Sequence, residues 1–594
     1  MKKSILKIRW LPLFIACSLF SPQLLSAQSL FTYKQQVQLN EKQKHFADAW
    51  ITELTTGTYS IITIDDQLFA NNSLSMLMPD GRNVIINKEQ MIPRNETMYS
   101  WYGSNMTDQI TASFVVHNDK VTGLIYVGKS IYQIHPLGDG LHLIFDSRPE
   151  NYPNDESPEG YKQMIQHGME KSLEKSIHFD SESNQFVDQE NIVTGNCKVR
   201  VFVGYTQTCA DNLADPPGFI QSCIDASNTA YSNSSVYFQC ELARSYVYTY
   251  AETGITATEL DRWHNTSDGY MDNVSTLRNY YDADLCVLVV NSLSDWCGYA
   301  WTVASAPYND AFCVVDRGCA VGNLSFPHEL GHLYGCRHDT YVDGGSTPYA
   351  YGHGYIYFPG LWRTVMAYND YCTDNGSSCA RLQYFSNPAV TYGGIAMGTV
   401  ATNDNESALE ASVSAVAALE PYIYTKVIPY EVVWENEDGN LPGANSVENS
   451  DVYLVMSGAS MQWRAESFID MKTGFWALEG CNFRAVNESC TSLKLEDTSP
   501  ETEQLKNAVS GIHIYPNPFI ESTQLYFNLN ESSMVNIYLT NILGEKLNVL
   551  VDQTFYDSGA YKISINGNKL SAGVYFLVLE RGNEKSVNKI IKVQ

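Results

Sequence analysis

The chain has little positive charge and no long hydrophobic run. Its 594 residues hold 38 Lys and Arg against 66 Asp and Glu, which gives a formal net charge of −28 at pH 7. Such a chain is repelled by phosphate backbones and by anionic lipid surfaces, so nucleic acid is not an expected partner. A membrane-spanning helix needs about 20 apolar residues, and no run of that length occurs. We therefore expect no integral membrane segment.

Residues 1–27 have the pattern of a secretory signal peptide. Four cations precede a short apolar run from Trp10 to Phe20, and Ser26 and Ala27 end a small-residue cleavage site. The alternative is a membrane anchor, for which the apolar run is too short. The mature chain is therefore expected to begin near Gln28.

Cysteine is absent from residues 28–196 and frequent after them. Eleven cysteines fall within 197–379, and Cys481 and Cys490 follow. This density in an exported chain predicts disulfide bonds formed in an oxidising compartment. Thirteen is an odd number, so one thiol is expected to be free or to pair outside the chain, and buried Cys286 is the candidate. Cys481 and Cys490 are the first expected pair because they lie far from the others.

The length predicts several domains, and the local patterns divide the mature chain into four segments. These are residues 28–194, 195–422, 423–507 and 508–594. The first is β-rich, with one helix expected at Glu41–Leu54. The second alternates strands and helices, an α/β (α+β) pattern, with strands expected at Val199–Tyr205 and Leu285–Val290 and helices at Phe219–Tyr231 and Met271–Tyr281. The last two are all-β, and the final one fits a β-sandwich. The polar stretch from Pro149 to Glu190 predicts an exposed linker.

One short stretch carries the residues for metal chemistry. His328, Glu329 and His332 form an HExxH motif. Positions i and i+4 share one face of a helix, so both imidazoles can bind one metal ion. Glu329 is then close enough to deprotonate a metal-bound water. Zinc catalysis usually uses three protein ligands. Gly335 is expected to end the helix and turn the chain back, so that His338 supplies the third ligand.

The motif is longer than HExxH, and its full length resembles a known signature. Residues 328–339 read HExxHxxGxxHD, similar to the zinc signature of metzincin metalloproteases, and Asp339 after the third histidine resembles the adamalysin/reprolysin branch. The run TVMAY at 364–368 resembles the Met-turn of metzincins. The resemblance implies a metzincin catalytic domain at 195–422 with one catalytic Zn²⁺ and with Met366 as an apolar floor below its ligands. Calcium is possible in such proteins, but no residue pattern indicates it.

Tyr368 departs from the pattern of that branch. Astacins and serralysins, two other metzincin branches, use a tyrosine at this position as a mobile zinc ligand, whereas adamalysins generally do not. We hypothesise that Tyr368 either binds zinc in the resting enzyme or hydrogen-bonds the oxyanion. The alternative is a packing tyrosine with one polar partner.

The resemblance implies a secreted zinc endopeptidase that hydrolyses protein or peptide bonds by a zinc-bound water, with Glu329 as general base. The substrate would lie antiparallel to an edge strand, expected within Gly298–Asp316, and the segment after Met366 would wall the primed-side pocket. The alternative is a cell-surface adhesin or binding protein with a structural zinc site and no proteolysis. A structural site is usually closed by four side chains and needs no general base, so Glu329 favours the enzyme.

Residues 28–194 are expected to form an inhibitory propeptide of a zymogen, because 110–158 resembles the end of reprolysin-type prodomains. Many of those prodomains silence zinc with a cysteine, and the absence of cysteine here excludes that device. Latency would come from another ligand, such as an acidic residue, or from steric cover of the cleft. Activation would need cleavage between Asn151 and Asn196. The alternative is a permanent accessory β-domain.

The C-terminal segment resembles the sorting domain of type IX secretion in Gram-negative bacteria. The resemblance rests on IYPNPF at 514–519, SAGVYF at 571–576 and the terminal KIIK. It implies that the type IX machinery is a partner, and that the protein passes through the periplasm to be secreted or held on the outer-membrane surface. The alternative is an ordinary adhesive β-sandwich, which the fold alone would not distinguish.

Overall fold

The computed structural model describes residues 29–54, 59–148 except 96, 152–177, 198–417 except 305–307, and parts of 419–487 and 513–592. The predicted signal peptide lies outside these residues. The chain divides into two compact units, Met1–Ser492 and Leu493–Gln594. Within the described ranges, no helix is both long and apolar enough to cross a membrane.

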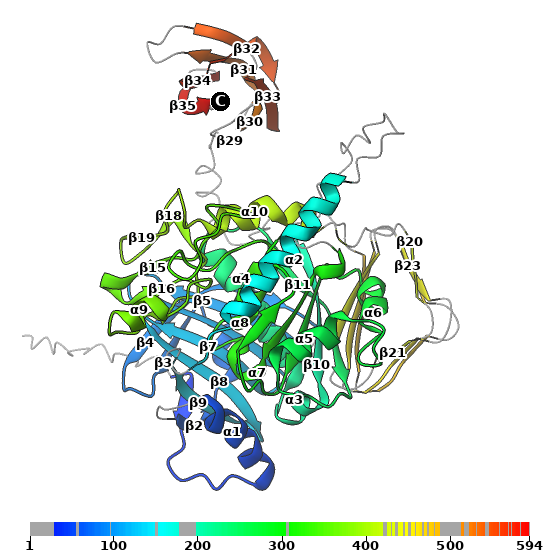
Figure 1. Ribbon diagram of the computed structural model, residues 1–594. Helices are drawn as coiled ribbons and strands as arrows, with labels where there is room; N and C mark the ends of the chain where they lie inside the picture. Colours follow the sequence, from blue (N-terminus) through cyan, green and yellow to red (C-terminus); the bar gives the residue numbers. More distant parts are fainter. Residues whose placement is uncertain are drawn as a thin grey trace, which may run out of the picture. The chain divides into compact units, whose positions relative to one another are not determined.

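The first unit begins with a nine-stranded antiparallel sheet (Figure 1). Its strands are, in sheet order, β1 (Phe31–Tyr33), β2 (Tyr59–Ile64), β9 (Leu141–Ser147), β8 (Ser130–Gly138), β7 (Lys120–Val127), β6 (Ile110–His117), β5 (Met98–Asn105), β4 (Asn83–Pro93) and β3 (Ser73–Leu77). A bridge between Ser29 and Ser75 brings the two edges together, so the sheet is barrel-like. Helix α1 (Glu41–Leu54) has the predicted bounds. The prediction of a β-rich N-terminal region is confirmed.

A helix occupies part of the stretch that was expected to be an exposed linker. This is helix α2 (Pro158–Ile177), in which the side chains of Tyr161 and Met164 are buried. Just before the helix, the side chains of Asp155 and Glu156 are buried as well. The linker prediction is wrong here. A polar segment is predicted to be exposed from its own composition. That composition contains no information about the residues, distant in the chain, that bury it in the fold.

The middle of the first unit is a mixed eight-stranded sheet with helices packed on it. Its strand order is β13 (Gly298–Ala300), β14 (Phe312–Asp316), β12 (Leu285–Val290), β10 (Lys198–Thr206), β11 (Gln239–Tyr248), β22 (Asp438–Gly443), β25 (Ser460–Ala465) and β28 (Asn482–Asn487). The pairs among β14, β12, β10 and β11 are parallel, whereas β13 is antiparallel to β14 at the edge. Every residue of β12 is buried, as expected for a parallel strand covered on both faces.

The helices and small sheets of this region include the predicted elements. The helices are α3 (Gln207–Asp211), α4 (Pro216–Asn233), α5 (Thr256–His264), α6 (Val274–Tyr280), α7 (Arg317–Ala320), α8 (Ser325–Leu333), α9 (Asp370–Asp374) and α10 (Asn405–Val416). Two small sheets contain β15 (Ile356–Tyr357), β16 (Trp362–Arg363) and β17 (Ala380–Arg381), and β18 (Asn387–Tyr392) and β19 (Ile395–Met397). The α/β pattern is therefore confirmed. Helix α4 packs against β6 and β7 of the N-terminal sheet.

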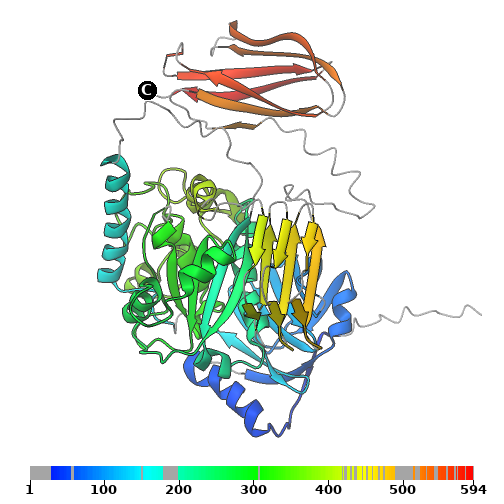
Figure 2. The same cartoon turned by 90° about the vertical axis from the view of Figure 1, so that its right-hand side faces the viewer.

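A three-sided coil of parallel strands continues the mixed sheet (Figure 2). Two of its sides are β20 (Thr425–Ile428), β23 (Ser446–Asn449) and β26 (Phe468–Asp470), and β21 (Glu431–Val433), β24 (Tyr453–Val455) and β27 (Phe475–Ala477). The third side is β22, β25 and β28, and β22 pairs with β11 of the mixed sheet. The strands of one side begin at Glu431, Tyr453 and Phe475, a regular step of 22 residues. These strands agree with the β structure that the sequence predicts for this segment.

The second unit contains two antiparallel sheets that share one apolar core. One sheet has the order β29 (His513–Tyr515), β30 (Ser522–Leu529), β33 (Gly559–Asn566); the other has β32 (Lys546–Tyr556), β31 (Ser533–Thr540), β34 (Gly573–Arg581), β35 (Glu584–Lys592). Leu525 and Ile565 of the first sheet pack in the core with Ile537 and Leu577 of the second. The prediction of an all-β C-terminal domain is confirmed.

The cysteines are mostly packed as small apolar groups. Disulfide bonds join Cys297 to Cys319 and Cys372 to Cys379. Seven of the described cysteines form no disulfide bond, whereas the sequence predicts a single such thiol; buried Cys286, the candidate, is one of the seven. Cys490, the partner predicted for Cys481, lies outside the described residues.

Candidate active site

Helix α8 and the turn after it bring three histidines to one point. His328, Glu329 and His332 lie on α8 and are fully buried. The helix ends at Leu333, and Gly335 follows with a φ of +88°. A residue with a Cβ atom adopts this conformation at a cost, whereas glycine does not. The turn at Gly335 returns the chain towards the helix, so that His338 meets the first two histidines.

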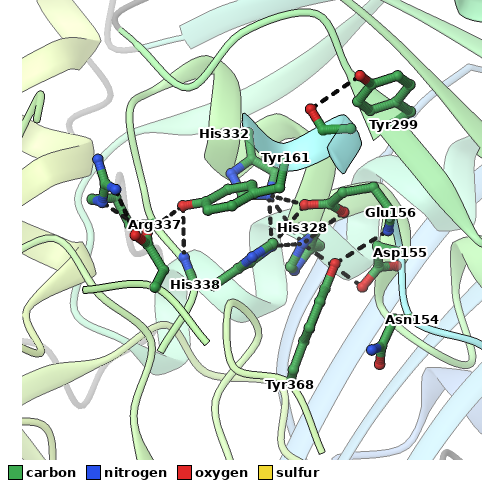
Figure 3. A network of polar contacts seen from close by, with 12 residues as sticks. Asn154, Asp155, Glu156, Tyr161, Tyr299, His328, His332, Arg337, His338 and Tyr368 are labelled. Atoms are coloured by element: carbon green, nitrogen blue, oxygen red, sulfur yellow. Dashed lines mark hydrogen bonds and ion pairs between the residues drawn. The ribbon is translucent and has the colours of Figure 1, made fainter. Parts of the chain in front are cut away.

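The three imidazoles have the geometry of a zinc site (Figure 3). The Nε2 atom of His332 lies 3.1 Å from Nε2 of His328 and 3.1 Å from Nε2 of His338, and the third side of this triangle is 3.2 Å. Tetrahedral zinc with bonds of about 2.0–2.1 Å would hold its nitrogens about 3.3 Å apart. The Nδ1 atoms of His328 and His332 face the carbonyl oxygens of Val365 and Cys336, at 3.0 and 2.9 Å. This orientation leaves both Nε2 lone pairs for a metal.

A carboxylate from the N-terminal region completes the site. Glu156 Oε1 lies 2.8 Å from His338 Nε2 and 3.3 Å from His332 Nε2, and Oε2 lies 3.8 Å from His328 Nε2. Both oxygens are buried and have no hydrogen-bond partner among the residues that the structure describes. A buried carboxylate left in this way is costly unless a cation accepts it. The four side chains therefore fit Zn²⁺, with Glu156 at the position that an open catalytic site reserves for water.

The pKa values of the two carboxylates at the site, Glu156 and Glu329, shift in opposite directions. Burial alone would raise the pKa of Glu156, but the facing histidines, His338 first, hold it well below its ordinary value. Burial, and then the charges of Glu156 and Asp155, raise the pKa of Glu329 well above its ordinary value. A carboxylate with a raised pKa is a better proton acceptor, which suits a general base. The Glu329 side chain also lies against Gly298, where a Cβ atom would come within 2.6 Å of Oε1.

The predicted Met-turn lies directly below the zinc helix. Met366 is fully buried, and a Cβ atom on Gly331 would lie 2.6 Å from its sulfur. Asp339 connects this turn to the third ligand, because its carboxylate accepts hydrogen bonds from the backbone of Tyr368 at 2.9 Å and of Tyr341 at 3.0 Å. Met366 and Asp339 thus support the metal site through the helix and through the third histidine.

Tyr368 lies beside the metal site and contacts the N-terminal segment. Its ring centroid is 4.1 Å from that of His338. Its hydroxyl accepts a hydrogen bond of 3.1 Å from the backbone N–H of Glu156. On the other face of His338, the ring of Tyr161 from α2 stacks at 4.0 Å. The N-terminal region therefore both supplies a ligand and covers the imidazoles.

The N-terminal segment also hydrogen-bonds to the edge of the mixed sheet. The backbone N–H of Cys297 donates to Asn154 O at 3.0 Å, and that of Gly298 donates to Asp155 O at 2.9 Å. Gly298 begins β13, the edge strand that falls within the range expected for substrate binding. The sequence is compatible with an acidic zinc ligand in this region, but no local pattern separates Glu156 from its neighbours.

Comparisons with known proteins agree with this site. Residues 196–408 match metallo-peptidase family M12, and residues 513–593 match a secretion system C-terminal sorting domain. A peptidyl-Asp metalloendopeptidase of Stenotrophomonas maltophilia (strain K279a) is 33% identical over 383 residues, 61% of this chain and 87% of that protein. A peptidyl-Asp metalloendopeptidase of Xanthomonas campestris pv. campestris is 32% identical over 378 residues, which are 61% of this chain and 86% of that protein. A peptidyl-Asp metalloendopeptidase of Pseudomonas fragi is 39% identical over 167 residues, which are 28% of this chain and 85% of that protein. The predictions of a zinc metalloendopeptidase and of a sorting domain are confirmed.

Proposed function

Because the chain belongs to metallopeptidase family M12, we propose that it is the latent precursor of a zinc endopeptidase, with residues 28–194 as its inhibitory propeptide. The observation that carries this proposal is the carboxylate of Glu156 on the three zinc ligands. A permanent accessory domain would have no need to fill the position that substrate and water require. A structural zinc site is disfavoured by a different residue, Glu329, which would have no role in such a site.

The catalytic roles follow from the positions of the side chains. When bound, zinc polarises the scissile carbonyl and makes water a nucleophile near neutral pH. Glu329 takes the proton from that water and passes it to the leaving amine. Once Glu156 has left, the hydroxyl of Tyr368 is free to hydrogen-bond the developing oxyanion. The N–H of Gly298 on the edge strand binds the substrate backbone as it binds Asp155 here.

Activation requires that Glu156 be released together with the helix that follows it. A cut between Asn151 and Glu156 would leave the carboxylate attached to the catalytic domain through α2 (Pro158–Ile177). We therefore place the activating cleavage after α2, within residues 178–194. This narrows the range of 151–196 expected from the sequence.

The relatives named as peptidyl-Asp metalloendopeptidases also suggest a substrate preference. We propose that this enzyme cuts peptide bonds beside aspartate. Buried Arg381, which lies 2.8 Å from a carboxylate oxygen of Asp155 beside the zinc ligands, supports this preference.

The test compares the full-length precursor with its Glu156→Ala variant, and uses Glu159→Ala as a matched control on the exposed face of α2. We expect one zinc per chain in all three, and at least about tenfold more cleavage of a denatured protein by Glu156→Ala, because a charged ligand is lost. Equal activity of the parent precursor and the activated enzyme would contradict the proposed latency. Zinc without cleavage after removal of the propeptide would support the binding protein instead.

The sorting domain indicates export through the type IX machinery, and we propose that the enzyme crosses the periplasm and is released or held at the outer-membrane surface of a Gram-negative bacterium. Deletion of residues 513–594 should leave the protein in the periplasm. Unchanged export would favour an adhesive role for this domain.

A further inference from the structure

We propose that Arg381 is the residue that recognises the acidic side chain of the substrate, and that Asp155 occupies its pocket in the precursor as a substrate mimic. This inference rests on the proposed function, namely cleavage beside aspartate at the zinc site. It assigns different roles to two adjacent carboxylates: Glu156 covers the metal, and Asp155 fills the specificity pocket.

Asp155 and Arg381 form a buried ion pair next to the zinc ligands. Each is 1% exposed, and Asp155 Oδ2 lies 2.8 Å from Nη2 of Arg381. The other oxygen, Oδ1, accepts a hydrogen bond from the hydroxyl of Ser325 at the start of α8. The same Nη2 atom lies 2.7 Å from Nδ1 of the zinc ligand His328. The pair is therefore directly adjacent to the metal site.

The guanidinium of Arg381 is held in place by the catalytic domain itself. Its Nε atom donates to Val365 O at 2.8 Å, and Nη1 donates to Asn323 O at 2.8 Å. These two bonds do not involve the propeptide and remain when it leaves. Arg381 lies in β17, in the segment after Met366 that is expected to wall the primed-side pocket. One edge of the guanidinium is thus fixed and the other faces the cleft, an arrangement suited to binding a carboxylate.

Removal of the propeptide would leave this pocket with an excess of positive charge. A second buried guanidinium, Arg363, borders the same cavity of about 30 Å³ as Asp155 and Arg381. Burial, and then repulsion by Arg381, lower the pKa of Arg363 to about 9, although nearby carboxylates, including Asp155, partly offset this. Without Asp155, Arg381 loses its carboxylate partner. A substrate aspartate would restore that partner, whereas a neutral or cationic side chain would leave the guanidinium buried and unpaired.

The backbone of the precursor supports the comparison with a substrate. Asp155 O accepts a hydrogen bond from Gly298 on the edge strand, and the next N–H, that of Glu156, donates to Tyr368. The peptide unit joining Asp155 to Glu156 therefore spans the cleft between the edge strand and the segment after Met366. A substrate bound in the cleft would place an acidic side chain against Arg381 by the same contacts.

The first test measures substrate choice by the enzyme activated from the full-length chain. Matched peptides carry Asp, Asn or Leu beside the scissile bond. We expect kcat/KM for the Asp peptide to exceed that for the Asn peptide about 100-fold, as for one buried charged hydrogen bond. In Arg381→Gln the Asp/Asn ratio should fall to within about threefold of unity, and Arg381→Lys should retain part of it. A structural defect would lower kcat/KM for both peptides equally. An unchanged Asp/Asn ratio of kcat/KM in a zinc-loaded Arg381→Gln enzyme therefore overturns the proposal.

The outcomes separate this inference from the proposed function. If the unaltered enzyme cuts peptides without preferring Asp, the proposed specificity fails but the endopeptidase stands. If it prefers Asp and Arg381→Gln keeps that preference, only the role of Arg381 fails.

The second test needs no variant of the enzyme and is independent of its folding. A synthetic peptide of residues 152–158 is added to the activated enzyme as an inhibitor, beside the same peptide with Asp155→Asn or Glu156→Gln. We expect each substitution to raise the inhibition constant, Asp155→Asn by about 100-fold for the same hydrogen bond. An Asp155→Asn peptide that inhibits as well as the parent would show that Asp155 does not use a specificity pocket.

Discussion

The two sides of the zinc site are built by different physical means. On the catalytic side, the first two histidines lie one helical turn apart on α8, so their geometry is set by the backbone and persists as long as the helix does. On the N-terminal side, Asp155 and Glu156 are held by contacts to Gly298, Tyr368 and Arg381, all distant in the chain. Cleavage of the chain can remove the second side without disturbing the first. The permanent metal site is built from residues that are close in the sequence, whereas the removable inhibitory segment is held by residues that are distant in the sequence.

The strongest prediction concerns the general base on the permanent side. Replacing Glu329 by Gln in the activated enzyme should lower kcat/KM by about 10³-fold, because proton transfer is lost while the shape is kept. Steady-state kinetics together with zinc content checks this. One zinc per chain with activity within about tenfold of the parent would show that Glu329 is not the base.

The next prediction concerns Tyr368, which contacts both sides. If its hydroxyl stabilises the oxyanion after activation, Tyr368→Phe should lower kcat by about 100-fold with little change in KM. Tyr371→Phe, on the neighbouring helix α9 (Asp370–Asp374), is the matched control. An unchanged kcat would make Tyr368 a packing residue.

A smaller effect should appear in the exchange of the metal. The precursor offers four protein ligands and the activated enzyme three, so zinc should pass to a chelator about tenfold more slowly from the precursor. The release is followed with a colorimetric zinc indicator. The Glu156→Ala precursor should lose most of this difference, and equal rates in all three proteins would argue against Glu156 as a ligand.

The smallest expected effect concerns the turn at Gly335, which brings His338 back to the two histidines of α8. Gly335→Ala should lower the free energy of unfolding by about 1–2 kcal/mol, because its φ of +88° is unfavourable for a residue with a Cβ atom. Gly344→Ala is the control, since nothing lies within 4 Å of the added atom. Thermal unfolding of the two variants measures the difference, and equal midpoints would contradict the account of this turn.

The same contrast explains what the sequence could predict. The three histidines and the helix at Glu41–Leu54 follow from spacing within a few residues. The edge strand within Gly298–Asp316 is instead an expectation from the resemblance to metzincins. Glu156 and Asp155 could not be identified, because their partners lie on other elements and their own neighbourhood reads as a polar linker. Ser325, the first residue of the zinc helix, likewise donates to Asp155, a contact that no local pattern indicates.

Closure of the precursor's zinc site by Glu156 can be seen in a crystal structure of the zinc-loaded full-length chain with anomalous data at the zinc edge. We expect one zinc bound by Nε2 of His328, His332 and His338 and by a carboxylate oxygen of Glu156 at about 2.0–2.2 Å. A zinc bound by the three histidines and a water, with the Glu156 carboxylate turned away, would contradict it.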